Sequence, residues 1–459
     1  MKFVNNDINR SVSYRTLKVL IKSVFVLLIP LWFTGVAYGQ NPIVPSGIYI
    51  ADPSVHVWKD GRLYLYGSLD ENTDDWCSHR YHVMSTDDLK NWVIQKDVFS
   101  SKGINDRVSY NDELLFAPDC SYKDEKYYLY YCQPDSLNAE GVAVSDTPNG
   151  PFQDAQALDL NGISEIDPSV FIDDDGQAYY VWGQFNMKMA KLKPNMIEID
   201  RATIKTQVLT EEEHYFHEGA FMTKRKGIYY LVYADISRSE MPTCLGYATS
   251  QFPMGPYKYG GVIIDNDQCN PGNWNNHGSI VEFRNQWYVF YHRSTHGSKV
   301  MRKACVEPIF FRADGSIPEV EMTSQGAAGP LDARLKIEAE WACNLQGTLR
   351  VEAVSSSEEA LAQIRNEDKA FYKYLDFGDG VSKVIVRMAP GVNGGVMNLF
   401  SGQPWHRCLA SIQIDPFTDR EFITITKEIE KVVGVQKLVL QFSGKEGCDI
   451  TSLDWFQFE

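Results

Sequence analysis

The sequence predicts an all-β protein, a five-bladed β-propeller followed by a β-sandwich of the jelly-roll type. Three observations support this prediction. A strand pattern repeats along residues 40–325, helical periodicity is scarce throughout, and a second set of short strands follows a break near residue 326. The apolar content of 44%, with 13% aromatic residues, is enough for a sizeable core, and aromatic side chains favour strands.

The repeat consists of a polar or acidic residue, a short apolar strand, a turn and a Tyr-rich strand. Copies begin at Asp52, Asp167 and Glu218, and we interpret Asp119 and His277 as the same point of two further copies. Copies of a few strands each, at intervals of roughly 50–65 residues, are typical of a β-propeller. Five blades around one axis would bring these positions to one mouth of the central channel, so carboxylates far apart in sequence would meet in space.

Residues 1–39 predict a signal peptide. Basic residues precede an apolar run, and the small residues Ala37 and Gly39 occupy the positions that a signal peptidase reads before Gln40. A membrane anchor is the alternative, but Pro30 interrupts the apolar run, and no other segment is apolar enough to span a bilayer. We therefore expect an exported protein, periplasmic or extracellular after cleavage, with no membrane span in the mature chain.

Turn signals divide residues 40–325 into hairpins. Residues 59–61, 173–176 and 224–227 are rich in Asp, Lys and Gly, and each lies between two apolar strands. The run Asp173–Asp175 lacks the rest of an EF-hand spacing, so we interpret it as a solvated turn rather than a calcium loop.

The break between the two parts is predicted as a linker over residues 326–335, where small residues and Pro330 interrupt the strand pattern. Residues 336–459 then form the second all-β unit. Alternating runs such as Val384–Met388 and Lys437–Phe442, within about 120 residues of short strands, are typical of a β-sandwich.

Composition excludes several classes of function. The net charge of −16 makes the chain a poor partner for nucleic acid or an anionic membrane, whereas it tolerates neutral ligands such as sugars. The sequence contains no phosphate loop, dinucleotide fingerprint, Gly-x-Ser-x-Gly elbow or His-Glu-x-x-His helix. We therefore expect no organic cofactor.

The nine cysteines are scattered, and none forms a Cys-x-x-Cys pair, which argues against a structural zinc site. Their number is odd, so at least one thiol has no partner within the chain. Cys120 and Cys132 flank one hairpin and are the pair that we consider for a disulfide, although packing as small hydrophobic side chains is favoured for most of the cysteines.

The acidic residues of the repeat indicate chemistry only when they are taken together. An Asp before Pro commonly starts a turn, so Asp52 or Asp167 alone would be structural, and Glu218 alone could be a solvated loop residue. Burying several carboxylates together is costly. Two or three carboxylates in an aromatic-lined pocket favour glycoside hydrolysis, in which one carboxyl protonates the leaving oxygen and another activates water or attacks.

These residues, within about residues 42–325, resemble glycoside hydrolase family 43, whose members are five-bladed β-propellers and inverting enzymes on arabinose, xylose or galactose linkages. The resemblance implies that Asp52 is the general base and Glu218 the general acid. It implies that Asp167 orients the acid and raises its pKa, which a neighbouring negative charge does. Inversion also implies a separation of roughly 6.5–9.5 Å between base and acid.

The resemblance further implies substrate-binding roles for Trp76, Phe116, His277 and Arg293. Trp76 and Phe116 would stack on sugar faces, although the family often has Trp where Phe116 stands. His277 matches a channel histidine close to a central calcium or water, so a second ion near His277 is left open. Arg293 matches an arginine that touches substrate hydroxyls. A hydrogen-bonded core histidine and a surface ion pair are the alternatives for His277 and Arg293.

The second unit resembles the jelly-roll carbohydrate-binding modules of family 6, through its start at Ile337–Glu340 and its end at Leu453–Phe456. The resemblance implies a structural calcium, an ion that prefers hard oxygen ligands. The implied ligands are Glu338, Glu340 and Asp454.

The pair of cleft aromatics usual in such modules is not evident. Tyr374 and Trp405 are candidates, with core packing as the alternative. The module could therefore support the propeller without binding sugar itself.

The prediction from sequence is an exported α-L-arabinofuranosidase, or a related exo-acting enzyme, on side chains of plant oligo- or polysaccharide. The alternatives within this class are β-xylosidase, endo-arabinanase and galactosidase, since loop shape decides among them. Retaining fructan-type propellers are disfavoured because they carry Asn-Asp-Pro-Asn where this chain has residues 51–54, Ala-Asp-Pro-Ser. A non-catalytic sugar-binding protein is the alternative from another class. The oligomeric state is open.

Overall fold

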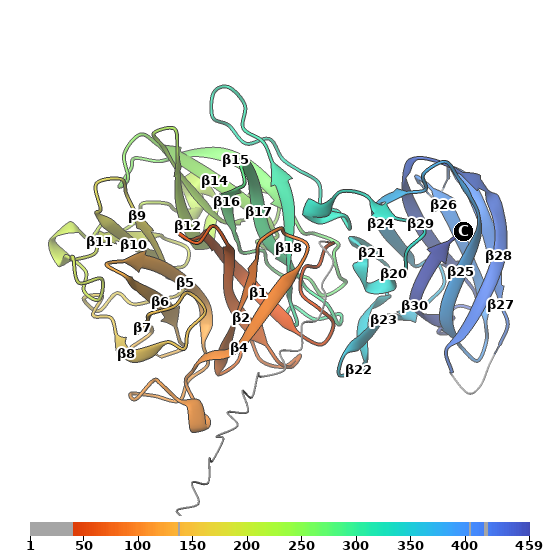
Figure 1. Cartoon of the computed structure of the whole chain (residues 1–459), viewed down its shortest axis with the longest axis horizontal. Coiled ribbons are helices and arrows are strands. Elements are labelled where there is room, and N and C mark those ends of the chain that lie inside the picture. The colour runs from red at the N-terminus through yellow and green to blue at the C-terminus, as the bar shows by residue number, and fades with distance from the viewer. Residues whose placement is uncertain (1–39, 136–137, 404, 417–420) are drawn as a thin grey trace, which may run out of the picture. The chain divides into compact units, whose positions relative to one another are not determined.

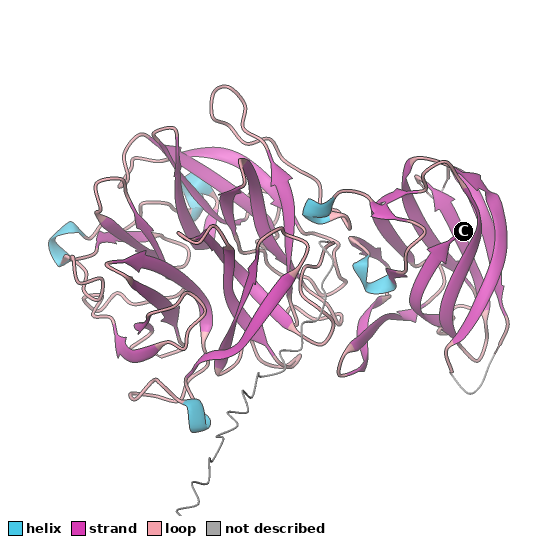
Figure 2. Ribbon diagram, viewed as in Figure 1, coloured by secondary structure: helices cyan, strands magenta, loops and turns pink. Residues whose placement is uncertain are grey.

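The computed structural model describes residues 40–459, except 136–137, 404 and 417–420. The predicted signal peptide therefore lies outside the described residues. Strands dominate the fold, as Figure 2 shows, and the helical elements are single turns. They are α1 (Glu211–His214), η1 (Gly103–Asn105), η2 (Arg201–Thr203), η3 (Gly326–Ala328) and η4 (Ala339–Trp341).

Within the described residues, no helix combines the length and the apolar character needed to cross a bilayer.

The N-terminal part consists of five antiparallel sheets that follow one another along the chain (Figure 1). Blade 1 contains β1 (Tyr49–Val57), β2 (Leu63–Asp70), β3 (Arg80–Thr86) and β4 (Trp92–Ser100). Blade 2 contains β5 (Phe116–Lys123), β6 (Lys126–Cys132), β7 (Glu140–Ser145) and β8 (Gln153–Ala157). Blade 3 contains β9 (Ser169–Ile172), β10 (Ala178–Trp182) and β11 (Lys188–Lys191).

The last two blades repeat this arrangement. Blade 4 contains β12 (Phe216–Arg225), β13 (Ile228–Asp235), β14 (Cys244–Ser250) and β15 (Lys258–Asp265). Blade 5 contains β16 (Ser279–Phe283), β17 (Gln286–Arg293) and β18 (Lys303–Ile309). The first strands of the five blades contact one another in a closed cycle, β1 to β5, β5 to β9, β9 to β12, β12 to β16 and β16 to β1. The predicted five-bladed β-propeller is confirmed.

Tyrosines of the second strands fill the space between neighbouring blades. Tyr66 of β2, Tyr131 of β6 and Tyr180 of β10 are almost completely buried. Burying a large aromatic side chain stabilises a fold by roughly 1.5–3 kcal/mol. The Tyr-rich strands of the sequence repeat therefore supply the core of the propeller, and they leave the polar first residues of each blade at the central channel.

The N-terminal segment completes blade 5. The backbone N–H of Ile43 donates to the carbonyl of Ala304 at 2.9 Å. The side chain of Asn41 donates to the carbonyl of Val306 at 3.0 Å and accepts the N–H of the same residue at 2.8 Å. The beginning and the end of the propeller sequence thus meet in the same blade.

The C-terminal part consists of two six-stranded sheets with a β-sandwich order of strands, as predicted. One sheet contains β19 (Leu331–Asp332), β21 (Asn344–Gln346), β24 (Lys369–Asp376), β26 (Gly395–Ser401), β27 (Arg407–Ile414) and β29 (Val435–Ser443). The other contains β20 (Ile337–Glu338), β22 (Arg350–Ser355), β23 (Glu358–Ile364), β25 (Val381–Pro390), β28 (Ile423–Val432) and β30 (Thr451–Phe458).

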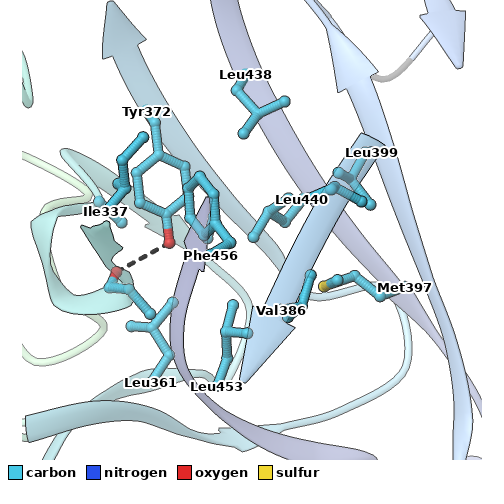
Figure 3. Packing of buried hydrophobic residues seen from close by; sticks show 14 of the residues in the cluster. Ile337, Leu361, Tyr372, Val386, Met397, Leu399, Leu438, Leu440, Leu453 and Phe456 are labelled. Atoms are coloured by element: carbon cyan, nitrogen blue, oxygen red, sulfur yellow. Dashed lines mark hydrogen bonds between the residues drawn. The ribbon is translucent and has the colours of Figure 1, made fainter. Parts of the chain in front are cut away.

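The core of the sandwich lies between these sheets. Figure 3 shows Leu438 and Leu440 of one sheet together with Leu453 and Phe456 of the other, and all four side chains are buried. The hydroxyl of Tyr372 enters this apolar layer and donates to the carbonyl of Ala339 at 2.9 Å, so the buried polar group is satisfied.

The segment predicted as a linker is more ordered than expected. Residues 326–335 include η3 and β19, and Leu331 and Asp332 of β19 pair in parallel with Leu375 and Asp376 of β24. The first strand of the sandwich therefore begins inside that segment. Such a short strand has no periodicity from which it could be predicted.

The disulfide that we considered is absent. Cys120 and Cys132 are both buried free thiols, and so are most of the other cysteines of the chain. Packing as small hydrophobic side chains, the favoured alternative, describes them correctly.

Candidate active site

Two of the predicted acids stand at kinks where a blade begins. Asp52 and Asp167 have left-handed backbone conformations, with φ of 52° and 59°, which are uncommon for residues other than glycine. Each is followed by a proline, and the pairing of β1 with β2 is interrupted between Ala51 and Ser54. Local strain of this kind persists only where the surrounding contacts hold it, and it is concentrated at functional sites.

His277 lies between these two acids. Its Nδ1 is 3.6 Å from Oδ1 of Asp52 and 4.0 Å from Oδ2 of Asp167. A Cβ on Gly219 would come within 2.7 Å of the imidazole ring, so the residue after Glu218 has to be a glycine for the strand to pass the histidine. Burial lowers the pKa of His277 and outweighs the opposite effects of Asp52 and Glu218, which keeps the ring neutral.

Asp52 is buried and held as a carboxylate. Nη1 of Arg302 donates to its Oδ1 at 2.8 Å, and the hydroxyl of Ser68 donates to its Oδ2 at 2.6 Å. Burial by itself raises the pKa of Asp52, but the positive charge of Arg302 opposes burial, and the pKa of Asp52 is lowered. Asp52 therefore carries a fixed negative charge at neutral pH.

Arg302 is itself held rigidly by a second acid. Its Nε and Nη2 donate to the two carboxylate oxygens of Asp70, each at 2.9 Å, which is the bidentate geometry that a guanidinium favours. The guanidinium carbon lies 4.7 Å from the centre of the Trp76 ring. Asp52 and Asp70, both buried, thus share Arg302. The two hydrogen bonds to Asp70 fix the guanidinium beside Asp52.

Glu218 is held differently, by two neutral amides. Nε2 of Gln184 donates to its Oε2 at 2.8 Å, and Nδ2 of Asn275 donates to its Oε1 at 3.2 Å. Among the described residues, no ion pair involving Glu218 is present. Its side chain is only partly buried, which leaves it accessible from the channel mouth.

Asp167 lies beside Glu218 and is more deeply buried. Its backbone N–H donates to the thiol sulfur of Cys132 at 3.2 Å. Burial, followed by the charges of Glu218 and Asp52, raises the pKa of Asp167 well above its usual range. Asp167 therefore keeps its proton to a higher pH than an ordinary aspartate, while Asp52 stays ionised.

The comparisons with known proteins agree with this arrangement. Residues 39–317 match Glycosyl hydrolases family 43, and residues 338–459 match the carbohydrate binding module of family 6. The chain belongs to glycosyl hydrolase family 43. It is therefore a glycosidase, with a C-terminal carbohydrate-binding module.

Curated relatives and solved structures of family 43 align with one module or with both. A xylosidase/arabinosidase from Thermoclostridium stercorarium is 35% identical over 66% of this chain and 72% of its own length. An arabinoxylan arabinofuranohydrolase from Paenibacillus polymyxa is 26% identical over 91% of this chain and 74% of its own length. The crystal structure of an arabinoxylan arabinofuranohydrolase from Bacillus subtilis covers 92% of this chain and 97% of its own, with 25% identity and a TM-score of 0.54.

Not every residue that the family 43 resemblance implied lies in the site. Arg293 is buried on β17, where it donates to the Tyr291 hydroxyl at 2.7 Å and to the carbonyl of Thr323. The preceding residue, His292, faces Asp52. Successive strand residues point to opposite faces, so the predicted pocket position of Arg293 is wrong, and its surface alternative is wrong as well. Arg302 is the arginine that reaches the base.

Asp119 is also displaced from its predicted position. It follows Pro118, whereas Asp52 and Asp167 precede the equivalent prolines that line the channel cavity. Asp119 therefore takes the place of Ser54, one step deeper in the channel, where it contacts Nε2 of His56 at 2.6 Å. The predicted equivalence of Asp119 with the other acids is wrong by two residues.

The two aromatic candidates lie next to residues of the site. Trp76 is half-buried against the guanidinium of Arg302. Phe116 is half-buried directly before Ala117, just as Glu218 stands directly before Gly219 in blade 4. Both aromatic residues are in places where a sugar ring could contact them, and their stacking role stays a prediction.

The residues that sequence reasoning missed are Asp70, Gln184, Asn275, His292 and Arg302. Asn275 lies in the loop that leads from β15 into β16, and the other four lie at the end of a second strand or in the loop that follows it. These ends return to the mouth where the first strands start. The signal available in the sequence was the alternation of strand direction, since every second strand runs back toward the channel mouth. This alternation predicts which segments lie near the site, but it does not predict which of their residues contact the acids.

Two of the three acids implied as calcium ligands are engaged in ion pairs. Glu338 pairs with Lys336 at 2.9 Å, and Asp454 pairs with Arg387. In the part of the chain that the structure describes, no three His, Cys, Asp or Glu residues are grouped as a metal site requires. Oε2 of Glu340 is buried without a hydrogen-bond partner, and both that ion and a second ion near His277 stay predictions.

The two candidate sugar-binding aromatics of the module, Tyr374 and Trp405, differ in their exposure and contacts. Trp405 is 77% exposed, whereas the hydroxyl of Tyr374 donates to Glu321. Core packing is thus wrong for Trp405. Its large exposed ring is available for a sugar face.

Proposed function

We propose that this protein is an exported, inverting family 43 glycosidase that removes arabinofuranosyl units from a plant hemicellulose. The observation that carries the proposal is the unequal environment of its carboxylates. Asp52 is held ionised by Arg302, whereas Glu218 is only partly buried and lies beside Asp167, whose pKa is raised by burial and by the charge of Glu218. Pairs of acids whose environments separate their protonation states are what acid–base catalysis needs.

The roles follow from these environments. Asp52 accepts a proton from the water that attacks the anomeric carbon. Glu218, accessible and held by two amides, gives its proton to the leaving oxygen. Asp167 is buried beside it, and each of the two carboxyl groups, when it is ionised, favours the protonated form of the other. His277, neutral between Asp52 and Asp167, has a ring nitrogen in reach of both and could contact a sugar hydroxyl.

The choice of sugar is supported by the relatives that align with both modules. Two curated proteins that cover 91% of this chain are named arabinoxylan arabinofuranohydrolase. β-Xylosidase activity is the second candidate, since relatives with 31–35% identity over the catalytic region are named xylosidase/arabinosidase. The basic, apolar and small-residue pattern of residues 1–39 supports export.

A panel of nitrophenyl glycosides tests the proposal. The α-L-arabinofuranoside, β-D-xyloside, β-D-galactoside and β-D-galactofuranoside are compared by kcat/KM. We expect the arabinofuranoside to be the best substrate. A preference for the xyloside would replace the proposal with the second candidate. Sugar binding by calorimetry without release of nitrophenol from any glycoside would identify a non-catalytic sugar-binding protein.

A further inference from the structure

One histidine links the environments of the two catalytic carboxylates. His292 on β17 is completely buried. The backbone N–H of Asp52 donates to its Nδ1 at 3.2 Å. On the other side of the ring, Nε2 lies 3.1 Å from both the carbonyl oxygen and the side-chain oxygen of Asn275.

These contacts determine the tautomer of His292. Both atoms that face Nε2 are oxygens, so Nε2 has to carry the hydrogen and donate it. Nδ1 then keeps its lone pair and accepts the N–H of Asp52. The neutral Nε2–H tautomer satisfies the N–H of Asp52 and both oxygens of Asn275, whereas the other neutral tautomer leaves Nε2 facing two acceptors without a donor. Oδ1 of Asp52 also lies 3.3 Å from Nδ1, and it accepts its hydrogen bond from Arg302 instead.

Asn275 carries the connection onward to the acid. Its side-chain oxygen faces His292, so its Nδ2 is oriented toward Glu218 and donates to Oε1 at 3.2 Å. Asn266, which is completely buried, donates to the carbonyls of both Asn275 and His292, at 2.9 and 2.7 Å. The two residues are therefore clamped against each other.

We propose that His292 and Asn275 form a hydrogen-bonded bridge that positions the general base Asp52 and the general acid Glu218 relative to each other. The proposal rests on the catalytic roles proposed above for these two carboxylates. His292 and Asn275 are positioning residues, since each acts through a carboxylate and not on the substrate.

The topology explains why such a bridge is needed. Asp52 begins blade 1 and Glu218 begins blade 4, so the two acids stand on strands that do not pair. Blade 5 lies between those blades in the ring, and it carries His292 together with the loop that contains Asn275. Inversion requires room for a water between base and sugar, so the separation of the two acids has to be held by the blade between them.

Two substitutions of His292 each break one end of the bridge. In His292→Asn, the side-chain oxygen can take the place of Nδ1 and accept the Asp52 N–H, but the donor to Asn275 is lost. In His292→Gln, the amide nitrogen can take the place of Nε2 and donate to Asn275, but the acceptor for Asp52 is lost. The Asn variant therefore disturbs the acid, and the Gln variant disturbs the base.

The two variants are distinguished by how their activity depends on the leaving group of the substrate. We expect His292→Asn to lose on the order of 10–100-fold in kcat on a poor leaving group and much less on dinitrophenol, which needs no proton. His292→Gln should lose similar activity on both, because water activation is needed for either. Equal losses in the two variants on both substrates, or no loss in either, would overturn the bridge.

Asn275 provides a second test, with the pH profile as the readout. Asn275→Ala removes a donor to the ionised form of Glu218, and Asn275→Asp adds a negative charge at the same place. Both changes disfavour ionisation of the acid, so the basic limb of kcat/KM should move to higher pH, further in the Asp variant. A basic limb that stays in place in both variants would overturn the link to Glu218.

His82 provides a matched control. It is buried on β3, and its Nδ1 accepts the N–H of Asp97 at 3.1 Å, where Asp97 also has a left-handed φ, of 54°. His82→Asn and His82→Gln should change the melting temperature by amounts similar to those of the His292 variants, without any change in leaving-group dependence. The same kinetic effects in the His82 variants would show that loss of a buried histidine, and not the bridge, is responsible.

Direct observation of the tautomer is independent of activity. Long-range nitrogen–proton NMR of the histidine rings, assigned with His292→Asn, should show a neutral ring with the hydrogen on Nε2. A hydrogen on Nδ1 would overturn the bridge.

The catalytic roles and the bridge can fail separately. Fully active Asp52→Asn and Glu218→Gln variants would refute the catalytic roles. Inactive carboxylate variants together with unaffected His292 and Asn275 variants would refute only the bridge.

Discussion

Nη1 of Arg302 lies 2.8 Å from Oδ1 of Asp52, and the two residues are 250 positions apart in the sequence. The contact joins the first blade to the segment that enters β18, the last strand of the last blade. Both groups are buried, so each depends on the other and on Asp70, because a buried charge without a partner costs several kcal/mol. The ring closure of the propeller and the charge state of the base therefore depend on the same ion pair.

Replacing Arg302 should change the pH dependence of catalysis. Arg302 lowers the pKa of Asp52, so its loss raises that pKa, and the base becomes protonated at a higher pH. In Arg302→Met the acid limb of kcat/KM should move to higher pH by at least about one unit, with a loss of kcat on the order of 10²-fold. Arg293→Met is the matched control, a buried arginine outside the site, and should keep the acid limb of the wild type.

The roles of the two carboxylates predict different responses to the leaving group. Glu218→Gln should abolish activity on natural linkages and spare part of the activity on dinitrophenyl glycosides, because a good leaving group needs no proton. Asp52→Asn should be inactive on both, since both reactions need an activated water. Steady-state rates on the two substrates decide this, and a Glu218→Gln variant equally impaired on both would contradict its role as the acid.

The anomeric configuration of the product should be inverted. Asp52 and Glu218 stand on different blades and are held by different partners, Arg302 and Gln184, so we expect the wide separation of base and acid that inversion requires. Proton NMR of the sugar first released, taken before mutarotation, gives the configuration. A product with the configuration of the substrate would show that Asp52 is a nucleophile.

Glu340 should make the sandwich less stable as the pH rises. Burial, followed by the charge of Glu359, raises the pKa of Glu340 from 4.5 to about 8. Between these values the folded chain keeps a proton that the unfolded chain releases, so stability falls with increasing pH, by at most about 1.4 kcal/mol per unit. In calcium-free buffer, denaturant unfolding of Glu340→Gln should show a flatter pH dependence. The exposed Glu430→Gln is the control and should keep the wild-type slope.

Calcium should raise the melting temperature if the resemblance to family 6 modules extends to the ion. Glu338 and Asp454 would then exchange Lys336 and Arg387 for calcium, which prefers carboxylate and carbonyl oxygens. A thermal melt with calcium, with magnesium and with a chelator provides the measurement, and Asp454→Asn should lose the calcium response. Identical melts in all three buffers would exclude a structural calcium ion.

The fold and the acids were predictable because both depend on local pattern. Asp52 and Asp167 precede prolines at strand starts, and Glu218 lies one residue before the equivalent position, which Gly219 occupies, so one repeat located all three to within one residue. The position of Asp119 was misjudged because an offset of two residues leaves the strand pattern intact. Arg293 was misjudged for the opposite reason, since a shift of one residue turns a side chain to the other face of the sheet.

The partners of the acids were not predictable in the same way. Arg302, His292 and Gln184 reach the site from strand ends and loops of different blades, and their identity depends on how those blades meet around the channel. The spacing of these residues in the sequence does not predict that they come together in space. The β19 strand was missed for a similar reason, because its pairing with β24 is made by tertiary context and not by periodicity.

The pairing of Asn41 with Val306 has a consequence for how the chain is made. The two residues are separated by 265 positions, so the closing contact forms only after nearly the whole propeller sequence is present. Contacts of such long range are slow to form, because the loop between them has to be ordered first. A chain synthesised from its N-terminus therefore stays open while it emerges. For the export that we propose above, this order would leave the chain unfolded enough to pass a secretion channel before the ring closes.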